Sequence, residues 1–244
     1  MPRHAVVLAA AFAALAAALS AAAPAADPAA PVARLTAPHY ASDIARGPIF
    51  RLRLAARGSG IEGMTLEFRS NSNVSTRWRR VGPDKVRRTA RFRGRPGETY
   101  RFRLRARDTF GNRSPYSYGI TSVPRDDRSP RLRFTGGWRR LRSAGAYEGT
   151  LRRAQQPGAT ASLLFRGGRL ALIARRSPGA GRLLVQIAGR EEFVSLRGRR
   201  RGRAVVFRSR LLRPGVYRPH LIALGGGPVD LDAVAIEQGP RAPR

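Results

Sequence analysis

The residues best suited to chemistry are the five arginines of the segment RGRRRGR, which are Arg197, Arg199, Arg200, Arg201 and Arg203. A guanidinium group donates hydrogen bonds from a planar fork, so it can bind a carboxylate, sulfate or phosphate bidentately. Five such groups in seven residues predict a candidate anion-binding site. The alternative is a flexible, solvated hairpin loop, because the segment lies between two expected strands.

A second row of arginines occupies every other position of RFRLRAR, at Arg101, Arg103, Arg105 and Arg107. The residues between them are aromatic or aliphatic and point to the opposite face of a strand. Successive arginines then lie about 7 Å apart, where two unit charges in water repel by only about 0.6 kcal/mol. Such a row is stable without a ligand. We therefore interpret it as the exposed face of a sheet rather than as a polyanion site.

Residues that could catalyse a reaction or bind a metal are scarce. Asp230 and Asp232 lie two apart in an expected strand, so their carboxylates share one face. Calcium needs six to eight oxygen ligands, and the abundant arginines favour a pair that balances guanidinium charge. His39 and His220 belong to no local motif that supplies a partner. Without cysteine, G-x-S-x-G or H-E-x-x-H, we expect no catalytic residue, no metal site and no cofactor.

Two aromatic residues, Trp138 and Tyr147, are candidates for stacking against a sugar ring. One or two aromatic residues per β-sandwich are also typical of a hydrophobic core, so this alternative stays open.

The composition is dominated by arginine. The chain of 244 residues has a formal net charge of +32, and Lys85 is the only lysine among its 47 basic residues. This bias is typical of a genome rich in G and C, so part of the charge has a compositional origin. With 42% hydrophobic residues, the chain can form packed cores and is not disordered by composition.

The N-terminus resembles an export signal. Arg3 and His4 precede an uncharged run from 5 to 26, and Ala23-Pro24-Ala25 offers a small-residue cleavage site. We expect residues 1–25 to be a signal peptide and the protein to be secreted, with no transmembrane segment in the mature chain. The alternative is a chain tethered to the membrane by an uncleaved N-terminal segment.

The remainder shows strand alternation and turns, and no window has a helical period. Residues 26–34 are rich in Pro and Ala and predict a linker. A first domain over 35–124 contains FRLRL, GMTLEFRS, RFR and TYRFRLRA, with apolar and arginine residues alternating. The segment VPRDDRSP predicts a second linker over 125–130.

The first domain resembles bacterial fibronectin type III domains over about residues 31–123. The resemblance rests on WRRV followed by PGETYRFRLRARDTFGNRSPYS. It implies a seven-strand sandwich with Arg51 and Arg91 on paired strands of one sheet and Arg101 to Arg107 on the other, beside Trp78. It also implies that Tyr100 is a "tyrosine corner", whose hydroxyl bonds upstream backbone, and that Gly111 has a positive φ.

The second domain, 131–238, contains eight expected strands: RLRF, TASLLF, RLALIAR, RLLVQIA, EFVSL, AVVFR, YRPHLIAL and VDLDAVAI. A tail over 239–244 follows. Eight antiparallel strands predict a jelly roll. The order GGWRRL, YEGT, GATA, LLRPGVYRPHLIAL and PVDLDAVAI is similar to galactose-binding-like modules of secreted bacterial proteins. This chain has Ala188-Gly189-Arg190 where such modules often have Asp-Gly, and Tyr217 where they have His, which weakens the sugar-binding implication.

We therefore predict an all-β protein with two antiparallel β-sandwich domains, fibronectin type III-like and then a jelly roll, after a signal peptide. The expected function is non-catalytic binding or adhesion to an extracellular or cell-surface glycan. One alternative is electrostatic binding of anionic polymers such as envelope phosphopolymers or extracellular DNA, without specific nucleic-acid recognition. The other alternative is an extracellular hydrolase with no recognisable motif. The sequence does not indicate an oligomeric state.

Overall fold

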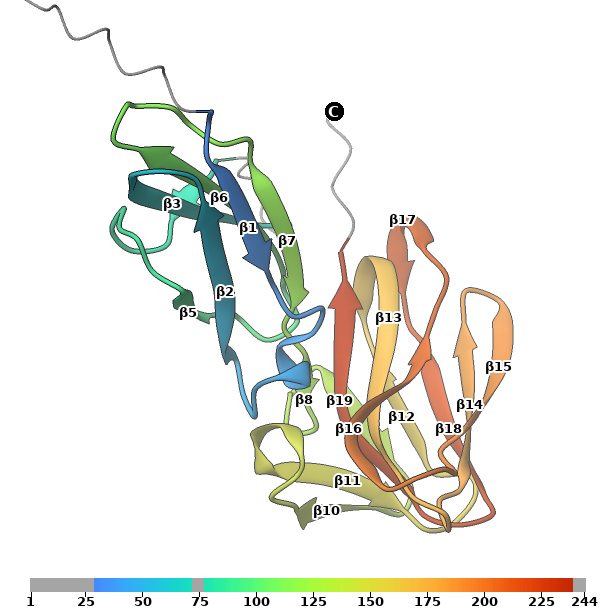
Figure 1. Cartoon of the computed structure of the whole chain (residues 1–244). Helices are drawn as coiled ribbons and strands as arrows, with labels where there is room; N and C mark the ends of the chain where they lie inside the picture. The colour runs from blue at the N-terminus through green and yellow to red at the C-terminus, as the bar shows by residue number, and fades with distance from the viewer. Residues whose placement is uncertain (1–28, 72–76, 239–244) are drawn as a thin grey trace, which may run out of the picture.

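The computed structural model describes residues 29–71 and 77–238, and strands dominate these segments (Figure 1). Every pairing between its named strands is antiparallel. The strands form four sheets, of three, four, five and seven strands. The predicted all-β, antiparallel sandwich class is confirmed. In the described residues no helix is long and apolar enough to span a membrane.

The N-terminal sandwich contains two sheets. The first has the order β1-β2-β5, with β1 (Val32–Thr36), β2 (Ile49–Arg57) and β5 (Thr89–Arg93). The second has the order β4-β3-β6-β7, with β4 (Arg79–Arg80), β3 (Ile61–Ser70), β6 (Thr99–Asp108) and β7 (Ser117–Ser122). A short 3-10 helix, η1 (Ala41–Asp43), lies between β1 and β2.

Alternation of side chains builds the core of this sandwich. Phe50 and Leu52 of β2 and Phe102 and Leu104 of β6 are at most 2% exposed, and the arginines between them point outward. The expected sheet assignment holds, because β2 pairs with β5 and β6 pairs with β3. Val32 to Arg34, expected in the linker 26–34, instead belong to β1, since their backbone pairs with β2.

Two local features implied by the resemblance are present. The Tyr100 hydroxyl accepts a hydrogen bond from the Arg95 backbone N–H at 2.9 Å and donates one to Glu98 at 2.8 Å. Burial raises the pKa of Tyr100 to about 12. The Asp108 carboxylate accepts backbone hydrogen bonds that close the following turn, in which Gly111 has φ +88°.

The C-terminal sandwich packs a seven-stranded sheet on a five-stranded sheet. The larger sheet contains β8 (Arg125–Asp126), β10 (Trp138–Arg142), β11 (Thr150–Ala154), β13 (Phe165–Arg176), β16 (Arg201–Arg208), β17 (Leu212–Tyr217) and β19 (Val229–Glu237). The smaller sheet contains β9 (Leu132–Thr135), β12 (Thr160–Leu163), β14 (Arg182–Ile187), β15 (Arg190–Ser195) and β18 (His220–Gly225). A 3-10 turn, η2 (Tyr147–Gly149), precedes β11.

This sandwich has more strands than the eight expected. Besides β8, which lies in the expected linker, and β17, whose first residues were expected to form a turn, the strands that were not predicted are β10 and β11, which pair with each other. Each contains two adjacent arginines, Arg139-Arg140 and Arg152-Arg153, which interrupt the alternation that marks a strand. β11 is placed by its pairing with β19, and β10 by its pairing with β11, rather than by local pattern.

The two sandwiches touch over a buried junction. Tyr40, from the N-terminal sandwich, is 2% exposed and packs in one cluster with Tyr147, Ala171, Ile173, Ala233 and Ala235 of the C-terminal sandwich. The expected linker 125–130 is part of the C-terminal sandwich, because β8 pairs with β19 and Asp127 is 2% exposed. The predicted division into domains stays a prediction, but the chain between them is not a free tether.

The predicted signal peptide (1–25), the start of the predicted linker and the predicted tail (239–244) lie outside the described residues.

Candidate anion-binding site

The arginine-rich segment 197–203 joins β15 to β16, but only its first half is a loop. Arg201 and Arg203 already belong to β16. The loop is anchored rather than free, since the Gly198 N–H donates to the Ser177 carbonyl at 3.2 Å and the Ser177 N–H donates to Leu196 at 3.3 Å. The segment is therefore held against the end of β13, whose last residue is Arg176.

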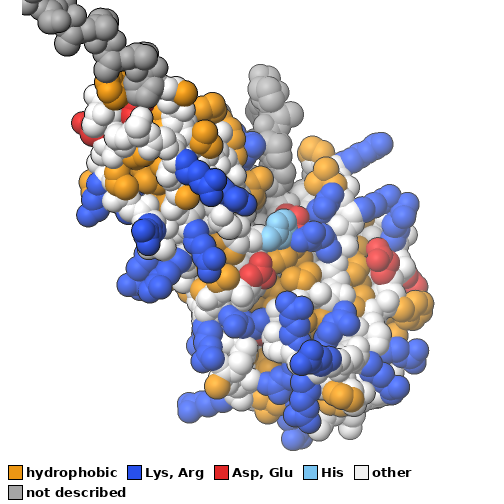
Figure 2. Space-filling view, in the orientation of Figure 1, with side chains coloured by type: hydrophobic (Ala, Val, Ile, Leu, Met, Phe, Trp, Pro, Cys, Tyr) orange, Lys and Arg blue, Asp and Glu red, His pale blue; other side chains and the backbone are white. Residues whose placement is uncertain are grey.

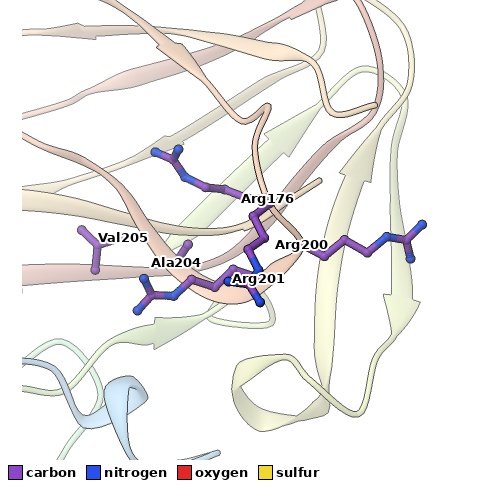
Figure 3. A pocket seen from close by; sticks show the side chains of 6 residues that line it. Arg176, Arg200, Arg201, Ala204 and Val205 are labelled. Carbon is purple, nitrogen blue, oxygen red and sulfur yellow. The ribbon is translucent and has the colours of Figure 1, made fainter. Parts of the chain in front are cut away.

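Arg199, Arg200 and Arg201 line one pocket of about 630 Å³ together with Arg176, Ala204 and Val205. In Figure 3, Arg176 and Arg201 extend to the side on which Val205 lies, whereas Arg200 extends the other way. Arg176 and Arg201 are direct cross-strand partners in the pairing of β13 with β16. Like charges placed opposite each other on a sheet repel, so this pairing costs free energy unless an anion lies between them.

In the part of the chain that the structure describes, no acidic residue lines this pocket. Within residues 29–71 and 77–238, none of its four arginines forms an ion pair. Guanidinium groups stay protonated at physiological pH. The pocket thus presents uncompensated positive charge beside one exposed apolar side chain, that of Val205, which suits an anionic group.

The other two predicted anion-binding residues have structural contacts instead. Arg197 donates to the backbone carbonyls of Ala180 (3.3 Å) and Gly226 (3.1 Å), which hold the loop. Arg203 donates to the Ala45 carbonyl at 2.6 Å and so joins the two sandwiches. Arg176 was not among the predicted site residues. It could have been found only from the register of β13 against β16, which the sequence does not specify.

The row Arg101 to Arg107 is not the bare exposed face that we expected. Arg103 lies between two rings, with its guanidinium carbon 4.4 Å from the centre of Trp78 and 4.3 Å from that of Tyr116. Its Nε is 2.6 Å from a Glu67 carboxylate oxygen. Arg105 also lies over Tyr116, at 3.9 Å. Cation–π contacts hold both Arg103 and Arg105, and Arg103 also has an ion pair, so these two guanidinium groups are structural rather than free for a ligand.

Trp138 and Tyr147 cannot act as the stacking platforms that we considered. Trp138 is 8% exposed and packs against Phe134 in the C-terminal core. Tyr147 is fully buried in the junction cluster with Tyr40. Their faces are covered by neighbouring side chains, so a sugar ring has no access to them. This corrects the candidate stacking assignment.

The candidate acids are also in structural roles. Asp230 accepts two hydrogen bonds from Arg153, at 2.6 and 2.8 Å, as expected of a pair that balances charge. Asp232 is 1% exposed and accepts a hydrogen bond from the Tyr147 N–H at 2.9 Å. Burial raises the pKa of Asp232 to about 7, against the opposing effect of that hydrogen bond. His39 lies 3.2 Å from Glu237, and His220 is exposed on β18.

The chain matches no family model and no curated protein. Three solved structures resemble it weakly. A family two carbohydrate esterase from Cellvibrio japonicus is 17% identical, with TM-score 0.38, over 48% of this chain and 34% of the esterase. The exo-beta-1,3-galactanase from Phanerochaete chrysosporium is 12% identical, with TM-score 0.39, over 78% and 54%. A carbohydrate-binding module of the beta-sandwich superfamily is 11% identical, with TM-score 0.35, over 84% and 97%. Scores this low do not establish a shared function.

Proposed function

We propose that this chain is a secreted, non-catalytic binding protein whose ligand is an acidic polysaccharide. One observation carries the proposal: four arginines that have no carboxylate partner among the described residues line a single pocket of about 630 Å³. An acidic sugar offers a carboxylate or sulfate for bidentate guanidinium contacts and a ring that can lie against Val205, which is 37% exposed. Secretion is supported by the pattern of residues 1–25.

The pocket favours an acidic over a neutral glycan. Recognition of neutral sugars commonly uses an exposed aromatic face, and the lining of this pocket contains no aromatic residue. The two rings that we considered for stacking, Trp138 and Tyr147, are buried. In place of an aromatic face, the pocket offers the positive charge and hydrogen-bond donors of its arginines.

The same lining favours a polysaccharide over nucleic acid. Single-stranded nucleic acids are held by rings on which the bases stack, and this lining contains none. Duplex readers insert a helix or a two-stranded ribbon into a groove, whereas β13 and β16 pair inside a sheet that contains further strands. Nucleic acid binding through charge alone is the competing outcome in the experiment that follows.

A non-catalytic role is supported by the chemistry of the lining. Its arginine, alanine and valine side chains include no group that accepts a proton or attacks a substrate near neutral pH. We further propose that the N-terminal sandwich is fibronectin type III-like, as the Tyr100 hydrogen bond to Arg95 supports, and that the C-terminal sandwich is the carbohydrate-binding module.

The test compares two triple variants of equal charge. The loop variant carries Arg199→Gln, Arg200→Gln and Arg201→Gln. The control variant carries Arg133→Gln, Arg182→Gln and Arg190→Gln, three exposed residues of the five-stranded sheet. Binding of polygalacturonate is measured by calorimetry at physiological salt, with duplex and single-stranded DNA of similar charge as competitors.

We expect the loop variant to lose at least about tenfold in affinity for polygalacturonate, about 1.4 kcal/mol, and the control to lose far less. Equal losses in the two variants would show diffuse charge attraction and refute the site. DNA that binds more tightly than polygalacturonate and responds to the same loop variant would refute the choice of ligand.

A further inference from the structure

The two outer faces of the N-terminal sandwich differ in how their arginines are used. On the β3–β6 side, arginines stack on rings or pair with acids, as Arg103 does with Trp78 and Glu67 and as Arg107 does with Glu62 at 3.1 Å. The face of the β1-β2-β5 sheet has no such partners among the described residues. Its outward positions carry six arginines and no acidic residue: Arg34, Arg51, Arg53, Arg57, Arg91 and Arg93.

The arginines of this second face are exposed and unpaired. All six side chains are exposed, and within the described part of the chain none of them forms an ion pair. Arg51 and Arg91 are direct cross-strand partners. This repeats the arrangement of Arg176 and Arg201 in the pocket of the C-terminal sandwich. In both places the fold sets like charges opposite each other, and no acidic side chain of the described residues pairs with them.

A second pocket, of about 900 Å³, extends from this face to the junction. Arg51, Arg53 and Arg91 line it on the sheet side, and Arg46 lines it near η1. Its apolar lining includes Ile44 and Ala45, and Ile44 is 57% exposed. The pocket therefore combines arginine side chains with apolar side chains, as the first pocket does.

Arg203 contacts one residue of the second pocket and is followed in the chain by two residues of the first. Its side chain donates to the carbonyl of Ala45, which lines the second pocket, at 2.6 Å. Its chain neighbours Ala204 and Val205 line the first pocket. Figure 2 shows basic side chains on both sandwiches on the face that this view presents, and Figure 1 places β2 and β16 toward the viewer on that face.

The junction holds the two pockets in fixed relation. The Tyr40 hydroxyl accepts a hydrogen bond from Arg208 of β16 at 3.0 Å and also bonds Glu237 of β19. The Thr99 hydroxyl donates to the Ile236 carbonyl at 2.8 Å, and the Glu148 N–H donates to the Arg46 carbonyl at 2.9 Å. A ligand that reaches both pockets would therefore find them pre-organised, with no domain closure to order on binding.

We propose that the second pocket and the arginine face of β1-β2-β5 form a further subsite for the same polysaccharide chain, so that one acidic chain binds along both sandwiches. This inference rests on the proposed function and extends it. We assign an acidic chain to this subsite by charge complementarity. Within the described structure, no carboxylate pairs with the four arginines that line the pocket, which are Arg46, Arg51, Arg53 and Arg91. Spanning two subsites raises the affinity of a long chain above that of a short one without new contacts at either subsite.

The experiment uses the full chain and two probes, a trimer and a dodecamer of galacturonate. A face variant carries Arg51→Gln, Arg53→Gln and Arg91→Gln, which alter exposed side chains only. It is compared with the loop variant and with the control variant of the five-stranded sheet. Thermal melting of each variant verifies that the sandwiches stay folded.

For the dodecamer we expect both the face and the loop variants to lose at least about tenfold in affinity. The slope of log K against log salt should become shallower by about one for each arginine–carboxylate pair that the substitutions remove. For the trimer the loop variant should lose affinity, whereas the face variant should match the control. If the face variant matches the control with both probes while the loop variant does not, the second subsite is refuted and the proposed function stands. If the loop variant also matches the control, the proposed function itself fails.

Discussion

Replacing Asp232 with asparagine should stabilise the C-terminal sandwich at alkaline pH and change it little in acid. Asp232 is 1% exposed on β19, and its carboxylate accepts a hydrogen bond from the Tyr147 N–H. Burial raises its pKa from 3.8 to about 7, and the nearby charges of Asp126 and Asp127 act in the same direction. Ionised Asp232 is therefore a cost to the folded state.

The direction in which the free energy of unfolding changes with pH follows from proton linkage. Between about pH 4 and about pH 7 the folded chain keeps a proton on Asp232 that the unfolded chain has released, so stability falls as pH rises through this window. A shift of about three pKa units corresponds to about 4 kcal/mol, which is the full penalty above about pH 7. Asparagine cannot ionise, and its side-chain carbonyl can still accept the hydrogen bond from Tyr147.

The assay is urea unfolding at about pH 4 and about pH 8, followed by the fluorescence of Trp138 in a Trp78→Phe background. The difference between Asp232→Asn and the parent should be near zero at the lower pH and should approach about 4 kcal/mol in favour of the variant at the higher pH. Asp230→Asn is the matched control on the same strand. It breaks the pair with Arg153 and should destabilise at about pH 8. A difference for Asp232→Asn that is equal at both pH values would refute the reasoning.

Three further substitutions test the structural contacts. In the parent chain, which keeps Trp78, Arg103→Gln should destabilise the N-terminal sandwich by about 1 to 2 kcal/mol in urea unfolding followed by circular dichroism, since it removes stacking on Trp78 and the Glu67 pair. The exposed Arg51→Gln should be nearly neutral in the same measurement. Tyr100→Phe should cost about 1 kcal/mol, and a change within error would count against the tyrosine corner. Tyr40→Phe should increase hydrogen exchange at the junction more than in either core, and unchanged exchange there would mean that this hydroxyl does not join the sandwiches.

Strands could be predicted from the sequence where alternate residues are buried. FRLRL and TYRFRLRA alternate strictly, so β2 and β6 could be predicted along with the face that each buries. The turn at Asp108 to Asn112 could also be predicted, because Gly111 and the Asp108 carboxylate are local signals. β10 and β11 could not, since Arg139-Arg140 and Arg152-Arg153 break the alternation, and only the pairing of β11 with β19 and of β10 with β11 makes them strands.

The candidate site was partly predictable for the same reason. Arg199, Arg200 and Arg201 stand out locally, but the addition of Arg176 depends on a strand register that no local signal fixes. The roles of Arg197 and Arg203 depend on carbonyl groups distant in sequence, at Gly226 and Ala45. Burial of Trp138 and Tyr147 is likewise a tertiary outcome, because an aromatic residue carries no local mark of which neighbours cover it.

The most direct test of the account compares one oligosaccharide with and without its charge. Galacturonate dodecamer and its methyl ester have the same sugar backbone, and only the acid offers carboxylates to Arg176, Arg199 and Arg201. Calorimetry with the full chain at physiological salt should show binding of the acid, weakening as salt rises, and no measurable binding of the ester. Equal affinity for the two oligosaccharides would contradict recognition of an acidic polysaccharide by the arginine pocket.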